Sequence, residues 1–321
     1  MAVLIKKMSD SRTWKARVKA LVSPALSLLL FVCASGALNS CGKSNAPPPT
    51  LVEQMKADSS VRIVCVSKQL TEMIFALGMG DKLVGTDLTS NYPPEQTAKL
   101  PKVGYHRLLS AEGIISLHPT IVLHDSNNAP KSALEQVGKA GIPVEYFPEA
   151  QNIDQAKDDL RELGKAFGVE HRADSLCHYL DSTMALALSI HHDTHPRIVV
   201  IHFGMVGMSY LVITKKNLAS KMVEWAGGIN PIDPGRGMAQ LSPELIAEAQ
   251  PDIILVTDYG FDHAGGIEGV KKLPGVALTP AAKNNRIYRI AEHDIVYFGP
   301  RTGDNVMKFE KLLYPDEKSS P

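Results

Sequence analysis

Residues 109–123 read LSAEGIISLHPTIVL, and residues 241–255 read LSPELIAEAQPDIIL. The two stretches share Leu, Ser, Glu, Ile, Pro, Ile and Leu at matching places. In each copy the serine (Ser110, Ser242) suits a helix N-cap, and the first-turn glutamate (Glu112, Glu244) is favoured by the helix dipole. Each helix should stop before the proline, and an apolar run typical of a buried strand follows. A capped helix and a core strand thus occur twice, which predicts two similar half-molecules.

Strands alternate with helices on both sides of each copy, which predicts two α/β lobes with mostly parallel sheets flanked by helices. The first lobe is expected to have strands at 62–66, 82–85, 121–123 and 143–146, and helices at 69–77, 132–140 and 154–167. The second is expected to have strands at 197–202, 253–256 and 286–290, and helices at 218–226 and 302–313. Residues 104–107 are expected to form a short turn, and residues 203–208 and 257–266 to form loops.

Residues 173–190 contain no proline and repeat Leu176, Leu180, Met184 and Leu188 every four residues, as a long helix does. This helix falls between the two repeats, so we expect it to connect the lobes. The predicted domains are 1–40, 41–58, 59–168, 169–195 (the connector) and 196–321. Ligands of open α/β sheets lie beyond the carboxyl ends of the strands, which predicts a ligand cleft between the lobes.

The first 40 residues are predicted to be a signal peptide, because a basic segment precedes an apolar run at 21–38. The run ends in Leu38-Asn39-Ser40-Cys41, which resembles the lipobox of bacterial lipoproteins, although Asn39 is unusual there. Lipidation of Cys41 is favoured over an ordinary signal cleavage. Residues 41–58 would then be an anchor and a proline-rich tether to a membrane. The expected location is the periplasm or cell envelope.

Charge and cysteine content limit the possible functions. Without residues 1–40 the chain has 34 − 6 = 28 basic and 34 − 1 = 33 acidic residues, so its net charge is −5 and no basic field for nucleic acid exists. Cys65 and Cys177 lie in apolar stretches and are expected in the core, and the sequence leaves open whether they pair.

The sequence offers little support for an enzyme, because GxSxG, HExxH, GxGxxG and CxxC are all absent. A zinc or manganese receptor is a further alternative, since the chain has eleven histidines. They are scattered, however, and the run His191-His192-Asp193-Thr194-His195 is expected to be a solvated turn after the connector helix.

The chain resembles the substrate-binding proteins of bacterial ABC importers that carry vitamin B12, ferric siderophores or haem, over roughly residues 60–315. Within this class it is most similar to the haem-binding members. The likeness is carried by KVGYHRLLSAEGIISLHP (102–119), FGMVGM (203–208), WAGGIN (225–230), GIEGVKKLPGVALTPAA (266–282) and FGPRTGDNVMKFEKLLYP (298–315).

The resemblance implies that Tyr105 is the axial ligand of ferric haem, which would be the transported ligand. A phenolate is a hard anionic donor suited to Fe(III), and Arg107 is expected to support it or to pair with a propionate. His106 can also face the cleft, and His202 is a candidate second ligand. Met205 and Met208 are candidate contacts to the porphyrin. A loop arginine of the family is replaced by Tyr259, which can stack or donate a hydrogen bond instead; His263 is a weaker candidate.

The resemblance also implies a partner, the permease dimer of the importer, whose subunits would each meet one exposed glutamate, Glu112 or Glu244. The implied function is a binding protein, not an enzyme, that delivers haem to an ABC importer. A cobalamin or ferric-siderophore receptor is the alternative within the class. The sequence leaves open the haem stoichiometry, the second axial ligand and the extent of lobe motion.

Overall fold

The computed structural model describes residues 60–126, 131–204, 208–233 and 235–315. The predicted signal peptide, Cys41 and the whole predicted tether therefore lie outside the described residues, as does Met205. None of the helices in the described part is long and apolar enough to cross a membrane.

The first lobe is built on a parallel sheet of four strands in the order β2-β1-β5-β6. The strands are β1 (Ile63–Val66), β2 (Leu83–Thr86), β5 (Ile121–His124) and β6 (Val144–Tyr146), close to the predicted positions. Its helices are α2 (Lys68–Ala76), α3 (Pro94–Thr97), α4 (Ala111–Ser116), α5 (Ser132–Lys139) and α6 (Ile153–Phe167). Alternate residues of β1 and β5 face two different cores, one shared with α2 and α6 and the other with α4 and α5.

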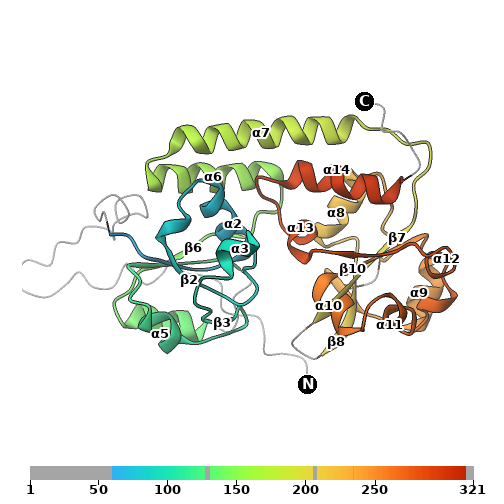
Figure 1. Cartoon of the computed structure of the whole chain (residues 1–321), viewed down its shortest axis with the longest axis horizontal. Helices are drawn as coiled ribbons and strands as arrows, with labels where there is room; N and C mark the ends of the chain where they lie inside the picture. Colours follow the sequence, from blue (N-terminus) through green and yellow to red (C-terminus); the bar gives the residue numbers. More distant parts are fainter. Residues whose placement is uncertain (1–59, 127–130, 205–207, 234, 316–321) are drawn as a thin grey trace, which may run out of the picture. The chain divides into compact units, whose positions relative to one another are not determined.

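The connector is α7 (Glu170–Ser189), a single helix of 20 residues that starts three residues before the predicted stretch. Figure 1 shows α7 alongside α6 and α14 (Thr302–Leu313). Glycines allow both helices to approach it closely. A Cβ at Gly164 of α6 would lie 2.4 Å from Ala173 Cβ, and one at Gly303 of α14 would lie 2.3 Å from Thr183 Oγ1. Helices of both lobes therefore pack on the connector.

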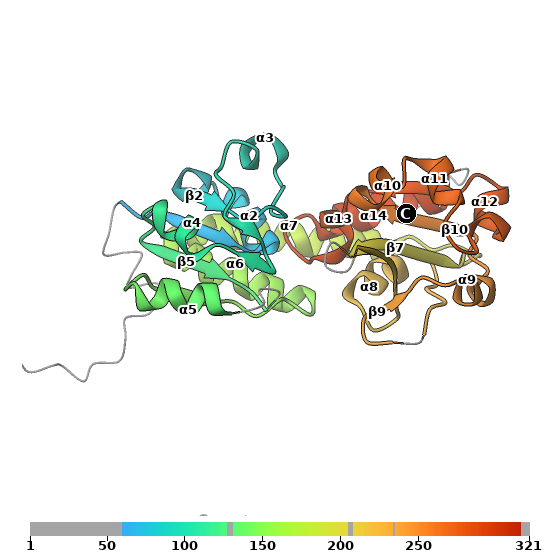
Figure 2. The same ribbon diagram turned by 90° about the horizontal axis from the view of Figure 1, so that it is seen from below.

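The second lobe has a mixed sheet in the order β11-β10-β7-β8-β9. The strands are β7 (Ile198–Gly204), β8 (Ser209–Ile213), β9 (Met238–Gln240), β10 (Ile253–Thr257) and β11 (Ile287–Ile290). The remaining helices are α8 (Leu218–Trp225), α9 (Pro243–Ala249), α10 (Asp258–His263), α11 (Ile267–Lys271), α12 (Pro280–Lys283) and α13 (Glu292–Val296). Residues of α8 and α11 pack on opposite faces of the sheet, as Figures 1 and 2 also show.

The predicted repeat is confirmed as α4–β5 and α9–β10. The Ser110 hydroxyl accepts a hydrogen bond from Gly113 N (2.9 Å), and the Ser242 hydroxyl accepts one from Leu245 N (3.2 Å). The residue before each proline is left-handed, with φ of 48° at His118 and 38° at Gln250. Both helices thus begin at a serine cap and end at a left-handed residue, and each is followed by a central strand of its sheet.

Two local predictions were wrong, and a third holds only in part. Residues 257–266 were expected to be a loop, but Thr257 ends β10 and Asp258–His263 forms helix α10. The glycine inside this helix lowers its intrinsic propensity. A Cβ at Gly260 would make a tight contact, 3.2 Å from Phe203 Cβ, which glycine avoids, and the Gly260 carbonyl accepts a 3.0 Å hydrogen bond from Tyr210 Oη.

The predicted loop at 203–208 begins inside a strand, since Phe203 and Gly204 belong to β7 and pair with Tyr210 and Ser209 of β8. The predicted solvated turn at 191–195 is also partly structural. The His192 ring stacks on Tyr314 (centroids 3.4 Å apart), and its Nε2 lies 3.0 Å from the buried Glu310 carboxylate.

Candidate functional site

Tyr105 lies on a two-stranded hairpin formed by β3 (Gly104–Tyr105) and β4 (Leu108–Leu109), where the sequence predicted only a turn. Gly104 has φ of 112°, and a Cβ there would lie 2.5 Å from Leu108 O, so the hairpin requires glycine at this position. Tyr105 pairs with Leu108, which places their side chains on one face of the hairpin. His106 and Arg107 form the turn.

The hairpin rests on the polypeptide that follows β2. Leu88 N donates to Gly104 O (2.8 Å), and Ser110 N donates to Val103 O (3.0 Å). Behind it, the fully buried carboxylate of Asp87 accepts bonds from Thr89 N (2.8 Å) and from the hydroxyls of Thr89 and Ser90. The Thr89 hydroxyl lies 3.1 Å from Nδ1 of His106. These contacts fix the turn that carries the tyrosine.

The electrostatics of Tyr105 and His106 favour their neutral forms. Burial raises the pKa of Tyr105, and the opposing effects of Arg107 and Lys68 are smaller. Burial and the nearby Lys68 lower the pKa of His106 to about 4. Arg107 therefore lowers the pKa of Tyr105 but does not by itself make it an anion.

Lys68 and Glu292 face this hairpin from two other elements, α2 and α13. They form an ion pair with each other, although the Lys68 residue is only 7% exposed. Burial opposes both charges, yet mutual attraction prevails: the pKa of Lys68 is raised by Tyr297 and Glu292, and the pKa of Glu292 is lowered by Lys68 and His202. The charges of both residues act on Tyr105 and on His106.

His202 belongs to the same electrostatic cluster from the second lobe. Its Nδ1 lies 3.5 Å from the Glu292 carboxylate and 3.4 Å from the Thr257 hydroxyl. Burial lowers its pKa, and Lys68 and Arg107 lower it further, against the attraction of Glu292. His106 and His202 were predicted separately in the two lobes, and the charges of Lys68, Glu292 and Arg107 act on both of them.

The other predicted contacts lie around α10 and the β7–β8 hairpin. The exposed Tyr259 ring packs on Phe203 (centroids 5.7 Å apart) and on His263 (6.1 Å). Met208 directly precedes β8. It has φ of 48°, and its side chain is highly exposed. Phe203, Tyr259 and His263 thus form an aromatic cluster on the second lobe. Their role toward a ligand stays a prediction.

The rule that ligands lie beyond strand ends marks residues 67–71 after the first strand, and this segment contains Lys68. The sequence did not single out Asp87, Thr89 or Glu292. Glu292 lies close after the parallel strand β11, where the same rule could have found it. Asp87 directly follows β2, so the same rule applies to it. Thr89 carries no pattern of its own.

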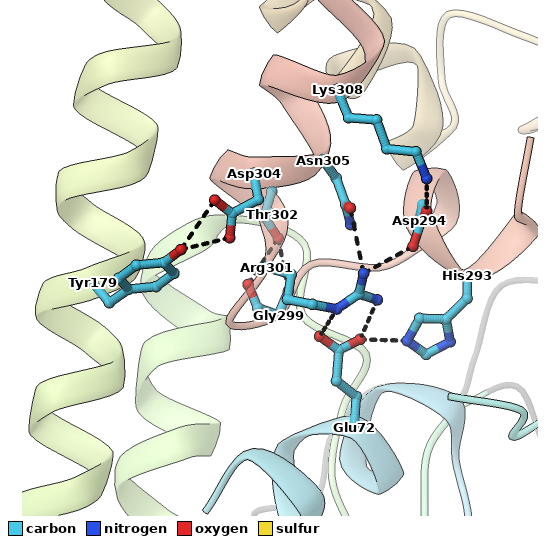
Figure 3. Close-up of polar contacts among 10 residues, drawn as sticks. All are labelled: Glu72, Tyr179, His293, Asp294, Gly299, Arg301, Thr302, Asp304, Asn305 and Lys308. Carbon is cyan, nitrogen blue, oxygen red and sulfur yellow. Dashed lines mark hydrogen bonds and ion pairs between the residues drawn. The ribbon is translucent and has the colours of Figure 1, made fainter. Parts of the chain in front are cut away.

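A second group of contacts joins the lobes beside the Lys68–Glu292 pair (Figure 3). Glu72 of α2 accepts bonds from Arg301 Nε (2.9 Å) and Nη2 (3.2 Å), and it is bonded to His293 of α13. Arg301 also donates to Asp294 (3.1 Å) and lies 3.5 Å from the ring centre of Tyr92. We call Glu72, His293, Asp294 and Arg301 the interlobe anchor.

The repeat glutamates Glu112 and Glu244 are exposed at the first turns of α4 and α9. A surface hollow of about 410 Å³ lies elsewhere, on α14, and it is lined by none of the predicted site residues. Cys65 and Cys177 are buried and free, and burial raises the pKa of Cys65 to about 12. In the described ranges, no group of three or more His, Cys, Asp or Glu is placed to hold a metal ion.

This chain is similar to several periplasmic binding proteins. The periplasmic heme-binding protein RhuT from Roseiflexus sp. RS-1, solved in apo form, is 35% identical with a TM-score of 0.74, covering 79% of this chain and 98% of that one. An uncharacterized ABC transporter substrate-binding lipoprotein, YvrC of Bacillus subtilis, is 28% identical over 85% of this chain and 88% of its own length. The vitamin B12-binding protein of Yersinia pestis is 26% identical, over 63% of this chain and 71% of its own length. The family model described as periplasmic binding protein matches residues 63–293, and the chain therefore belongs to that family.

Proposed function

We propose that this chain is an extracytoplasmic binding protein that captures haem and delivers it to an ABC importer, without catalysing a reaction. The observation that carries the proposal is Tyr105 on a short hairpin, with Arg107 two residues away and His202 in the same electrostatic cluster. The similarity to a heme-binding protein over most of the chain supports it.

The proposed ligand of the ferric iron is Tyr105. Burial keeps its phenol protonated in the free protein, so the iron must displace the proton, and coordination to a cation lowers the pKa of a donor strongly. Arg107 then favours the phenolate electrostatically. His202, His106, Met205, Met208 and Tyr259 are proposed to contact the porphyrin or to offer a second donor.

Hemin titration followed by absorbance and resonance Raman spectra tests this function. Wild-type protein should give the phenolate-to-iron charge-transfer band, and Tyr105→Phe should lose the band and bind hemin more weakly. Arg107→Ala should change the spectrum or affinity less. Tyr179→Phe is a matched control, because Tyr179 is an exposed α7 residue bonded to Asp304. An unaltered spectrum in Tyr105→Phe, with an unchanged circular dichroism spectrum, would place the ligand elsewhere.

Cobalamin is the second candidate ligand, favoured by the similarity to the vitamin B12-binding protein. A corrinoid already carries its own metal ligands and needs no tyrosine from the protein. Titration with cyanocobalamin should therefore give no saturable binding if the haem proposal is right. Saturable cobalamin binding that is insensitive to Tyr105→Phe would favour the alternative.

We also propose that lipid on Cys41 anchors the protein to a membrane. The lipobox-like LNSC, the proline-rich tether and the lipoprotein name of the Bacillus relative support this. Cys41→Ala should release the protein into the soluble fraction after export. A wild-type protein that is already soluble after export would contradict the anchor.

A further inference from the structure

The contact between Thr89 and His106 determines which imidazole nitrogen carries the proton. The Thr89 hydroxyl has one proton, and it donates that proton to the Asp87 carboxylate, which can only accept. Toward His106 Nδ1, 3.1 Å away, the same oxygen must therefore accept a hydrogen bond. The imidazole then carries its proton on Nδ1.

The Asp87 carboxylate, which accepts the Thr89 proton, is held in place by further hydrogen bonds. Asp87 is fully buried, and its Oδ1 also accepts from Thr89 N (2.8 Å), while Oδ2 accepts from the Ser90 hydroxyl. Both oxygens are thus supplied with donors by the backbone and side chains of the adjacent turn. The Thr89 hydroxyl uses its one proton on this carboxylate, so toward His106 Nδ1 it can act only as an acceptor.

We propose that Asp87 and Thr89 are positioning residues that hold His106 with its proton on Nδ1, so that Nε2 keeps its lone pair as a second iron donor beside Tyr105. Histidines that bind metals typically donate their other ring N–H to a carboxylate or a similar acceptor, which fixes the tautomer. Here the carboxylate acts through a threonine hydroxyl.

His106 lies next to Tyr105 on the hairpin, so its Nε2 and the Tyr105 oxygen are neighbouring candidate donors to the iron. Its ring lies 4.2 Å from the Tyr105 ring, centroid to centroid, and the two residues are adjacent in the chain. Both candidate donors therefore lie on the same hairpin. The phenolate is the harder donor and takes ferric iron, and the neutral imidazole takes it when the phenolate oxygen is absent.

The tautomer can be measured without any ligand, by two-bond proton–nitrogen correlation NMR of the ¹⁵N-labelled protein at neutral pH. His106 should show a protonated Nδ1 and an unprotonated Nε2. Thr89→Val removes the hydroxyl at nearly constant shape and should redistribute the proton toward Nε2, whereas Thr89→Ser should keep the wild-type pattern. Predominant Nε2–H in the wild type, or no change in Thr89→Val, overturns the proposal.

Two other histidines serve as internal controls. Nδ1 of His124 lies 3.1 Å from Asp125 O, and Nδ1 of His195 lies 2.9 Å from Gly227 O. Carbonyl oxygens only accept, so both rings should show Nδ1–H in every variant. They also report whether Thr89→Val has kept its fold.

The iron role rests on the proposed function and is tested separately with hemin. Tyr105→Phe should bind hemin with a nitrogen-ligated spectrum, and adding Thr89→Val should weaken that binding about 10–100-fold. Equal spectra and affinities in the single and double variants would overturn the iron role. If wild-type protein binds no hemin, the proposed function and the iron role both fail, and the NMR measurement still decides the tautomer.

Discussion

The two lobes share a strand order but differ in the direction of one strand. The first lobe has β2-β1-β5-β6, parallel throughout, and the equivalent strands of the second are β8-β7-β10-β11, with β8 antiparallel to β7. The central pairs match in register, since Ile63 pairs with Ile121 as Ile198 pairs with Ile253. The repeat therefore fixes the centre of each sheet and leaves its edge free to differ.

This difference explains where the site residues come from. A parallel neighbour requires a crossover, so α2 lies between β1 and β2 and supplies Lys68 and Glu72 near its start. In the second lobe β8, the next strand in the chain, is the antiparallel neighbour of β7, and β7 itself carries His202 near its end. In the second lobe the partners of α2 come from α13, after β11.

The first prediction concerns the two exposed glutamates that the lobes share. The resemblance to ABC-importer binding proteins implies that these glutamates meet arginines of the permease. Reversing Glu112 and Glu244 together to Lys should therefore abolish haem transport, because like charges would then face each other. Hemin titration should be unchanged, since both residues lie on α4 and α9 and neither belongs to the charge cluster around Tyr105. Uptake in reconstituted vesicles measures the effect.

Charge reversal elsewhere on the surface provides the control. Glu135 of α5 and Glu268 of α11 are exposed, one in each lobe, and their double reversal to Lys should leave transport near normal. Normal transport by the Glu112/Glu244 variant would remove the docking role. Equal losses in the two single variants would show that the lobes dock equivalently.

The second prediction concerns the interlobe anchor, the group of Glu72, His293, Asp294 and Arg301. Arg301→Ala should lower the free energy of unfolding by about 3 kcal/mol, because it leaves the buried Glu72 carboxylate with one fewer compensating charge. Lys308→Ala is the matched control: Lys308 bonds the same Asp294 at 2.7 Å but is mostly exposed, so its loss should cost less than about 1 kcal/mol. Urea unfolding compares them, and equal costs would contradict the anchor.

The same anchor predicts a dependence on pH. Burial alone would raise the pKa of Glu72, but His293 and Arg301 outweigh it and lower the pKa below its ordinary 4.5. Stability from this carboxylate is therefore present above pH 4.5 and is lost as the pH falls through the lowered folded-state pKa. Glu72→Gln should unfold less steeply with acid than the wild type, and an identical acid profile would show that Glu72 is not the titrating group.

Much of this fold could be predicted because its strands are buried on both faces. Such strands read as continuous apolar runs, and the repeated serine caps mark the helices before two of them. What was missed depended on tertiary packing. Helix α10 contains Gly260, whose value lies in its contact with Phe203 and not in its helix propensity. The end of strand β7, Phe203 and Gly204, was missed because FGMVGM suggested a loop, and strand β8 after it was not predicted.

The site was predictable only in part. Tyr105, His106, Arg107 and His202 follow from strand ends and from resemblance to a family. Lys68 and Glu292 are ordinary charges at helix starts, and their pairing across 224 positions is a property of the folded chain alone. A role for Asp87 and Thr89 can be recognised only in the folded chain, where Thr89 contacts His106.

The smallest expected effect tests the equivalence of the two repeats directly. Ser110→Ala and Ser242→Ala each remove a hydroxyl that accepts one helix N–H, and each should cost about 1 kcal/mol. Replacement by Gly should cost only a few tenths of a kcal/mol, about a third of the Ala effect, because glycine leaves the N–H group open to water. The two caps lie in different lobes and share no partner, so the double variant should show the sum. Urea unfolding resolves these differences if the slope stays constant. A loss confined to Ser110→Ala would show that Pro243, already fixed at the first helical position of α9, makes the second cap dispensable.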